Sequence, residues 1–181
     1  MRFIFIFISF FLLVSITLTE LYLKYIGLGD PVRYDSNYIY GYAPKENQKK
    51  ERLKGSKVTI NELGLRTPFT WNNSKKDKII FIGDSITYGG SYIDDEKIFS
   101  FLVCLKMKNY LCGNAGVNAY SIINMVMRSR HDQRINNEKV YIFTIAPGDF
   151  YREYAGSSTA HFYLNNNNFF LPAITEAISF F

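Results

Sequence analysis

The longest apolar pattern in the chain lies at its beginning, where residues 3–18 include three polar members, all with hydroxyl side chains. With Glu20 as its one charged residue, the apolar span continues to residue 23, about 20 residues in all, enough to cross a bilayer as a helix. A cleavable signal peptide is the alternative, but its cleavage site needs small residues, and those at 18–22 are bulky. We therefore predict an uncleaved membrane anchor at 1–24. Arg2 favours a cytoplasmic amino terminus, with the rest of the chain outside.

A second apolar run, Ile79 to Ile82, is short and mostly β-branched. Such a run predicts a strand that is buried on both faces. It ends at Gly83, and Asp84, Ser85 and a glycine pair follow before the next periodic segment. The Ser85 hydroxyl is therefore expected at the carboxyl end of a parallel strand, where open α/β sheets keep their ligand crevices. Free backbone N–H groups at such a turn suit an acyl-transfer nucleophile.

The remaining pattern alternates between helix and strand. Acidic residues at 94–96, followed by Lys97, open a predicted helix, and a short strand follows at 110–112. A second helix is predicted at 121–130 and a third strand at 140–145, and the apolar tail at 169–181 favours a last helix. This alternation is typical of an α/β domain on a parallel sheet. The third strand is apolar on both faces, so we expect it inside the sheet, unless no strand follows it and its outer edge is left unpaired.

The segment between the anchor and the first strand has a different character. Residues 26–77 are polar, show little periodicity and are interrupted by Gly and Pro, which indicates loops. One short strand is predicted at 58–60, and Arg66 is expected to be an exposed loop charge. We divide the chain into an anchor at 1–24, a loop-rich extracytoplasmic extension at 25–77 and an α/β domain at 78–181.

Composition and charge exclude some classes of function. The 181 residues are 48% hydrophobic, enough for a packed core, and the net charge of +5 is spread along the chain. Nucleic-acid binding needs a denser basic stripe, so no nucleic-acid partner is expected. Cys104 and Cys112 lack metal-ligand spacing, and no cofactor or metal is expected. The two cysteines could pair in an oxidising compartment, but we expect two free buried thiols.

Ser85 admits several interpretations. A serine after a strand is most often a helix cap. A phosphate-binding loop is excluded because no Gly-Lys-Ser/Thr follows, and the nearby glycines lack the spacing of a dinucleotide fingerprint. Residues 81–89 (Phe-Ile-Gly-Asp-Ser-Ile-Thr-Tyr-Gly) nevertheless resemble the first signature block of the SGNH/GDSL hydrolases. The resemblance implies that Ser85 is the nucleophile of an esterase.

Two later segments resemble further blocks of that family. Residues 113–121 are similar to the second block, in which a glycine, matching Gly116, donates its backbone N–H to the oxyanion. The third block is Gly-x-Asn-Asp, where Asp149 matches and is expected to position the turn. Gly148 replaces the asparagine and Ala146 the glycine. In the family, the side chain of this asparagine helps to hold the oxyanion. Removal of one oxyanion donor elsewhere lowers turnover on the order of 100- to 1,000-fold.

The order of these motifs, starting from Gly-Asp-Pro at 29–31, resembles membrane-anchored bacterial members of the family. The resemblance implies a three-layer α/β/α, flavodoxin-like domain on a parallel sheet. It also implies a serine esterase or acyl-ester hydrolase that acts on an extracytoplasmic glycan or lipid ester, with the membrane as its other partner. An O-acyltransferase on a surface glycan is the alternative enzyme.

The general base is missing from the pattern. The family takes its histidine and carboxylate from a late Asp-x-x-His block, and this chain has none. His131 precedes the third strand, in the wrong order. His161 has the right order, but Ser158 stands in the place of the aspartate. His161 is thus the one candidate base, and we expect a C-terminally incomplete domain with impaired activity. A catalytically inactive, membrane-tethered remnant or binding module is the rival class.

Overall fold

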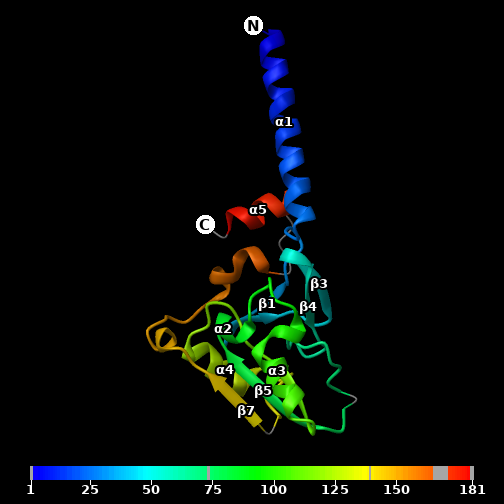
Figure 1. The fold of residues 1–181 in the computed structure, drawn as a ribbon. Helices are drawn as coiled ribbons and strands as arrows, with labels where there is room; N and C mark the ends of the chain where they lie inside the picture. Colours follow the sequence, from blue (N-terminus) through cyan, green and yellow to red (C-terminus); the bar gives the residue numbers. More distant parts are fainter. Residues whose placement is uncertain (1, 73, 139, 165–170, 180–181) are drawn as a thin grey trace.

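The structure of the chain is a computed structural model, which describes residues 2–72, 74–138, 140–164 and 171–179, with backbone alone at 2, 161 and 162. One long helix, α1 (Arg2–Tyr25), projects from a body of strands and short helices (Figure 1). Within Phe3–Tyr25, an 18-residue stretch reaches a mean hydropathy of 2.3, and only 6% of that stretch is buried. The predicted apolar helix is therefore confirmed as long and apolar enough to span a membrane or to act as a signal sequence.

Two antiparallel hairpins follow α1, where the sequence predicts mostly loops. β1 (Tyr34–Asn37) pairs with β2 (Gly41–Pro44), and β3 (Gln48–Arg52) pairs with β4 (Ser56–Ile60). A short turn, η1 (Leu53–Gly55), joins the second pair. The predicted strand at 58–60 lies within β4. The expectation of loops is wrong for the residues of β1, β2 and β3. Their sequences hid them, because β3 is polar throughout and β1 nearly so.

Three parallel strands form the sheet that carries Ser85. β5 (Asp77–Gly83) lies in the middle, with β6 (Tyr110–Asn114) on one side and β7 (Val140–Thr144) on the other. The predicted α/β class and parallel sheet are confirmed. Ile80 and Ile82 of β5 are completely buried, since neighbouring strands and packed layers surround them.

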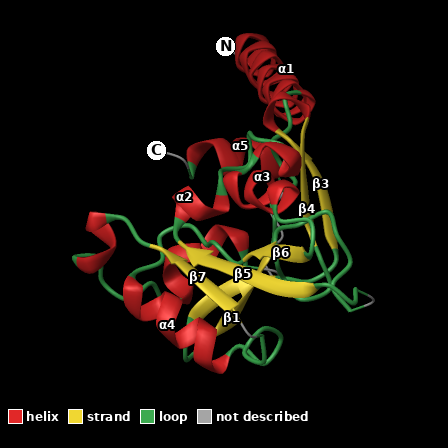
Figure 2. Ribbon diagram, turned by 60° about the horizontal axis from the view of Figure 1, so that its bottom comes forward, coloured by secondary structure: helices red, strands yellow, loops and turns green. Residues whose placement is uncertain are grey.

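Short helices connect the strands. α2 (Ser85–Tyr88) follows β5 directly, and after it come η2 (Asp95–Lys97) and α3 (Phe99–Lys106) on the way to β6. α4 (Ile122–His131) joins β6 to β7, and the chain continues through η3 (Pro147–Phe150), η4 (Ser157–Tyr163) and α5 (Pro172–Ile178). Figure 2 shows α3 and α4 on opposite sides of the sheet.

Successive residues of β5 supply two hydrophobic clusters. Phe81 points to the side of α3, where it packs edge-on against Phe99. Ile80 and Ile82 point to the other side and share a cluster with Met125 of α4. Hairpin residues belong to this second cluster, namely Tyr34, Tyr42, Val58 and Ile60. The extension at 25–77 and the sheet are therefore packed around one core.

The helix predicted from residue 94 begins five residues later, at Phe99. Asp94 and Asp95 serve β4 instead, accepting hydrogen bonds from two of its N–H groups at 2.9 and 2.7 Å. Leu102 and Val103 of α3 are 47% and 38% exposed, whereas Ser100 and Cys104 are buried.

The expectation that Arg66 is an exposed loop charge is wrong. Arg66 is 1% exposed, and its Nε donates to Asp95 Oδ1 at 2.9 Å. Its two Nη nitrogens donate to three carbonyls of the loop at 88–93. Its main chain bridges to Asn114 at the end of β6. Arg66 therefore fastens the loop after α2 to both the hairpin and the sheet.

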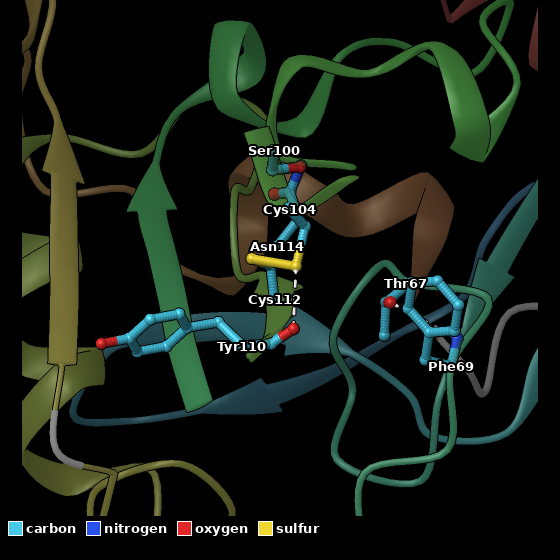
Figure 3. The surroundings of a disulfide bond; sticks show 7 residues. All are labelled: Thr67, Phe69, Ser100, Cys104, Tyr110, Cys112 and Asn114. Atoms are coloured by element: carbon cyan, nitrogen blue, oxygen red, sulfur yellow. Dashed lines mark hydrogen bonds between the residues drawn. A yellow bond between two sulfur atoms is a disulfide. The ribbon is translucent and has the colours of Figure 1, made fainter. Parts of the chain in front are cut away.

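The expectation of two free thiols is also wrong. Cys104 of α3 and Cys112 of β6 form a disulfide, with Cα atoms 5.7 Å apart (Figure 3). Both residues are buried in the cluster between α3 and the sheet. Disulfides persist in oxidising compartments and are rare in reducing ones.

β7 lies at an edge of the described sheet rather than inside it. Val140, Ile142 and Phe143 are 40%, 37% and 39% exposed, an unusual amount of apolar surface for an edge strand. α5 does not cover β7, since it packs against α1 (Figure 1). The carboxylate of Glu20 in α1 accepts hydrogen bonds from two N–H groups in the first turn of α5, at 3.1 and 2.9 Å.

Candidate active site around Ser85

The turn after β5 presents the Ser85 hydroxyl without using it. Asp84 caps α2, because its Oδ1 accepts the N–H of Ile86 at 2.9 Å. Ser85 is therefore the first residue of the helix and not its cap, and its side chain is exposed. Gly83 permits the tight turn, since a Cβ there would lie 1.9 Å from Thr87 Oγ1. The alternative of a capping serine is thus excluded by the neighbouring aspartate.

Ser85 lines a cavity of about 540 Å³, within the range of small-molecule sites. One wall comes from the loop after α2, another from the hairpins, and a third from η4 and α5. Five tyrosines line it: Tyr34, Tyr42, Tyr88, Tyr92 and Tyr163. Burial raises the pKa of Tyr42 to about 12, with Arg152 opposing the rise, and burial raises the pKa of Tyr34 and Tyr88 as well. These phenols are therefore neutral at physiological pH.

Arg152 joins the loops that follow all three strands. Its Nη1 donates to the carbonyl of Tyr120, after β6, at 2.6 Å. The same nitrogen lies 3.4 Å from Asp84 Oδ2, after β5, and 3.1 Å from Asp149 Oδ1, after β7. Because one guanidinium nitrogen meets three loops, it holds the carboxyl edge of the sheet together. No motif in the sequence pointed to this residue.

Asp149 positions the turn after β7. It is 1% exposed, and its Oδ2 accepts the N–H of Ala146 at 2.8 Å. This geometry matches the turn-positioning role expected from the sequence. Gly148 contributes no side chain to the site, and nothing lies within 4 Å of where a Cβ would stand.

The backbone N–H of Gly116 is not free to donate to an oxyanion, as its predicted role requires. Its N–H donates to Asn114 Oδ1 at 2.8 Å, so it is already paired. Its Cα packs against α2, where a Cβ would come within 2.3 Å of the Tyr88 nitrogen. Gly116 is needed for this close approach. It could hold an oxyanion only if its bond to Asn114 broke.

The turn at Asn118 and Ala119 lies in the cavity wall with Ser85. Ala119 has a φ of 65°, a left-handed conformation that is unusual for alanine and often marks functional sites. The Tyr42 hydroxyl donates to the Asn118 carbonyl at 2.7 Å, which fixes the peptide between the two residues. The N–H of that peptide belongs to Ala119 and has no partner among the described residues. Sequence reasoning missed this donor, because only the backbone conformation reveals it.

The two histidines take separate places. His131 is the last residue of α4 and is exposed. Because α4 runs back from the carboxyl edge of the sheet, its end lies away from Ser85. His161 lies in η4, and the residues just before it, Thr159 and Ala160, line the cavity. The His161 side chain lies outside the described part of the structure, so its role as base stays a prediction. No described side chain hydrogen-bonds to the Ser85 hydroxyl.

The described residues contain no cluster of three or more His, Cys, Asp or Glu side chains that could hold a metal ion. In comparisons with known proteins, no family model and no curated protein matches the chain.

Proposed function

We propose that the chain is a membrane-anchored serine acyl-ester hydrolase of SGNH/GDSL type, with a flavodoxin-like α/β/α domain outside the cytoplasm. One observation carries the proposal: the Ser85 hydroxyl is exposed, is not used in capping, and lines a cavity at the carboxyl edge of a parallel sheet. The Gly-Asp-Ser resemblance supplies the reaction class, which the geometry alone does not select.

In this proposal Ser85 attacks the ester carbonyl, and backbone N–H groups hold the oxyanion that develops. Its own N–H, at the first position of α2, is one candidate, and the N–H of Ala119 is the other. Arg152 and Asp149 keep the loops around the serine in place and do not touch the ester. His161 is the candidate base, delivered by η4.

A catalytically inactive binding module is the second candidate. It is favoured by the absence, among the described residues, of any histidine or carboxylate hydrogen-bonded to Ser85. A serine without its base keeps only the rate advantage that binding and the oxyanion donors supply. The two candidates share the cavity and differ in whether Ser85 reacts.

A fluorophosphonate probe on the full chain in membranes distinguishes them. Labelling of the wild type but not of Ser85→Ala supports the hydrolase. Ser91→Ala is a matched control, because Ser91 lines the same cavity and should leave labelling unchanged. Equal labelling of the wild type and Ser85→Ala, or none of either, would exclude Ser85 as a reactive nucleophile. Hydrolysis of p-nitrophenyl acetate, abolished by both Ser85→Ala and His161→Ala, would further identify His161 as the base.

A further inference from the structure

The last described helix, α5, is fastened to the base of α1. The carboxylate of Glu20 in α1 accepts the N–H groups of Ala173 and Ile174, at 3.1 and 2.9 Å, and lies 3.3 Å from Lys24 Nζ. Glu20 is 5% exposed, so these partners compensate a charge that is largely removed from water. The position of Glu20 along α1 therefore fixes where α5 begins.

A second set of contacts fixes which side of α5 faces the body of the protein. Glu176 is buried, and its carboxylate accepts hydrogen bonds from Arg52 Nη2 and, at 2.6 Å, from the N–H of Gly29. Ala173 is also buried, and its Cβ would lie 3.2 Å from a Cβ added at Gly29. Because residues three apart share one face of a helix, Ala173 and Glu176 mark the inner face of α5.

The outer face of α5, formed by Leu171, Ile174 and Ile178, is apolar. These residues are three and four positions apart, so they follow one side of the helix. Ile178 is 68% exposed, and the other two are partly exposed. Glu176, the one charged residue at 171–179, lies on the inner face. An apolar stripe of this kind without a charge indicates a surface that meets another apolar phase.

The level of α5 along α1 identifies that phase. From Phe3 to Glu20, α1 rises about 26 Å, close to the roughly 30 Å thickness of the hydrocarbon core of a bilayer. With α1 across a membrane, Glu20 therefore lies at the border of the hydrocarbon. The exposed apolar surface of α1 continues to this level, since Leu18 and Leu21 are 61% and 57% exposed. α5 runs across the base of α1 rather than along it (Figure 1), which is the orientation of helices that lie in a membrane interface.

We propose that the outer face of α5 inserts into the interface of the bilayer that α1 spans, as a second membrane contact of the chain. The inference rests on the membrane anchor of the proposed function and adds a fixed orientation to it. A single helix leaves the body free to turn about its axis, whereas a second contact beside that helix does not. Because Glu176 lines the cavity that contains Ser85, this contact also holds one wall of the cavity at the bilayer surface.

Quenching by labelled lipids tests this surface. The two native cysteines are joined in a disulfide, so a cysteine introduced as Ile178→Cys can be labelled selectively with the fluorophore NBD. In the full chain in phosphatidylcholine nanodiscs, this label should shift its emission to the blue and lose intensity when lipids carry a doxyl group near the headgroup. Aqueous iodide should quench it weakly. Ile178 is largely exposed, so its substitution should leave the fold intact.

Ile123→Cys is the matched control, because Ile123 is a 52% exposed isoleucine on α4, away from α1 (Figure 1). Its label should be quenched by iodide and not by the lipids. The same behaviour at Ile178 would overturn the inference. Protection of the Ile178 label from both quenchers would also overturn it, in favour of a contact with another protein or a second copy of the chain.

Phe11→Cys, in the middle of α1, reports separately on the anchor. Its label should be quenched by lipids that carry the doxyl group deep in the acyl chain. Quenching there without quenching at Ile178 would remove the second contact and leave the anchor standing. The absence of lipid quenching at Phe11 would overturn the anchor and this inference with it. Fluorophosphonate labelling of the same sample reports on Ser85, which the outer face of α5 does not include.

Discussion

The disulfide between Cys104 and Cys112 allows a stability prediction whose magnitude follows from the structure. The bond closes a short loop, because the two cysteines are 8 positions apart in sequence. Closing a loop of about nine residues removes about 8.6 cal/mol/K of entropy from the unfolded chain, or ~2.6 kcal/mol at 25 °C. Reduction of the bond should therefore lower the free energy of unfolding by about that amount. For a chain of this size the expected loss in Tm is roughly 5–10 °C.

The assay is thermal unfolding of the full chain in detergent, with and without a thiol reductant. The double variant Cys104→Ala, Cys112→Ala is the control, because its Tm should not respond to the reductant. Maleimide labelling after denaturation should find no free thiol in protein taken from intact cells and two after reduction. The same Tm in both redox states would refute the stability estimate. Free thiols in the cellular protein would place the pair in a reducing compartment.

Four further predictions follow. Alkaline phosphatase fused after the last residue should be active, and activity of a cytoplasmic reporter at the same place would reverse the topology. Arg66→Ala should cost about 3–5 kcal/mol in urea unfolding, because it leaves Asp95 buried without its partner; a loss under 1 kcal/mol would contradict this. Burial tends to raise the pKa of Asp132, but Arg134 and Arg128 outweigh burial, so the pKa of this carboxyl is lowered in the folded protein. The ionised Asp132 therefore stabilises the fold above about pH 4, and this stabilisation is lost as the pH falls through the pKa of the folded state. Asp132→Asn should therefore weaken the fall of Tm at acid pH. The same fall of Tm in the variant would argue against stabilisation by the ion pairs of Asp132 with Arg128 and Arg134. Ile142→Lys on the exposed edge strand should slow aggregation measured by light scattering, with an unaltered rate as the contrary result.

Features that depend only on neighbouring residues could be predicted from the sequence. The apolar helix α1, the buried strand β5 and the turn at Asp84 and Ser85 each arise from a local run of residue types with a strong preference for one conformation. Even in this turn, three-dimensional contacts decided which residue caps the helix and which is exposed. Either residue of the turn could cap α2, and the structure shows that Asp84 does so and leaves Ser85 exposed.

Features that join segments far apart in the sequence could not be predicted before the folded structure was known. Arg52 and Glu176 are 124 residues apart in sequence, and neither is remarkable among its own neighbours. Arg66 looked like a loop charge until Asp95 and the loop at 88–93 were seen around it. The polar strand β3 exists because β4 supplies its hydrogen-bond partners, not because its residues prefer an extended form. A charge or a polar strand is stabilised inside a protein by its partners, and a partner far along the chain leaves no local pattern to read.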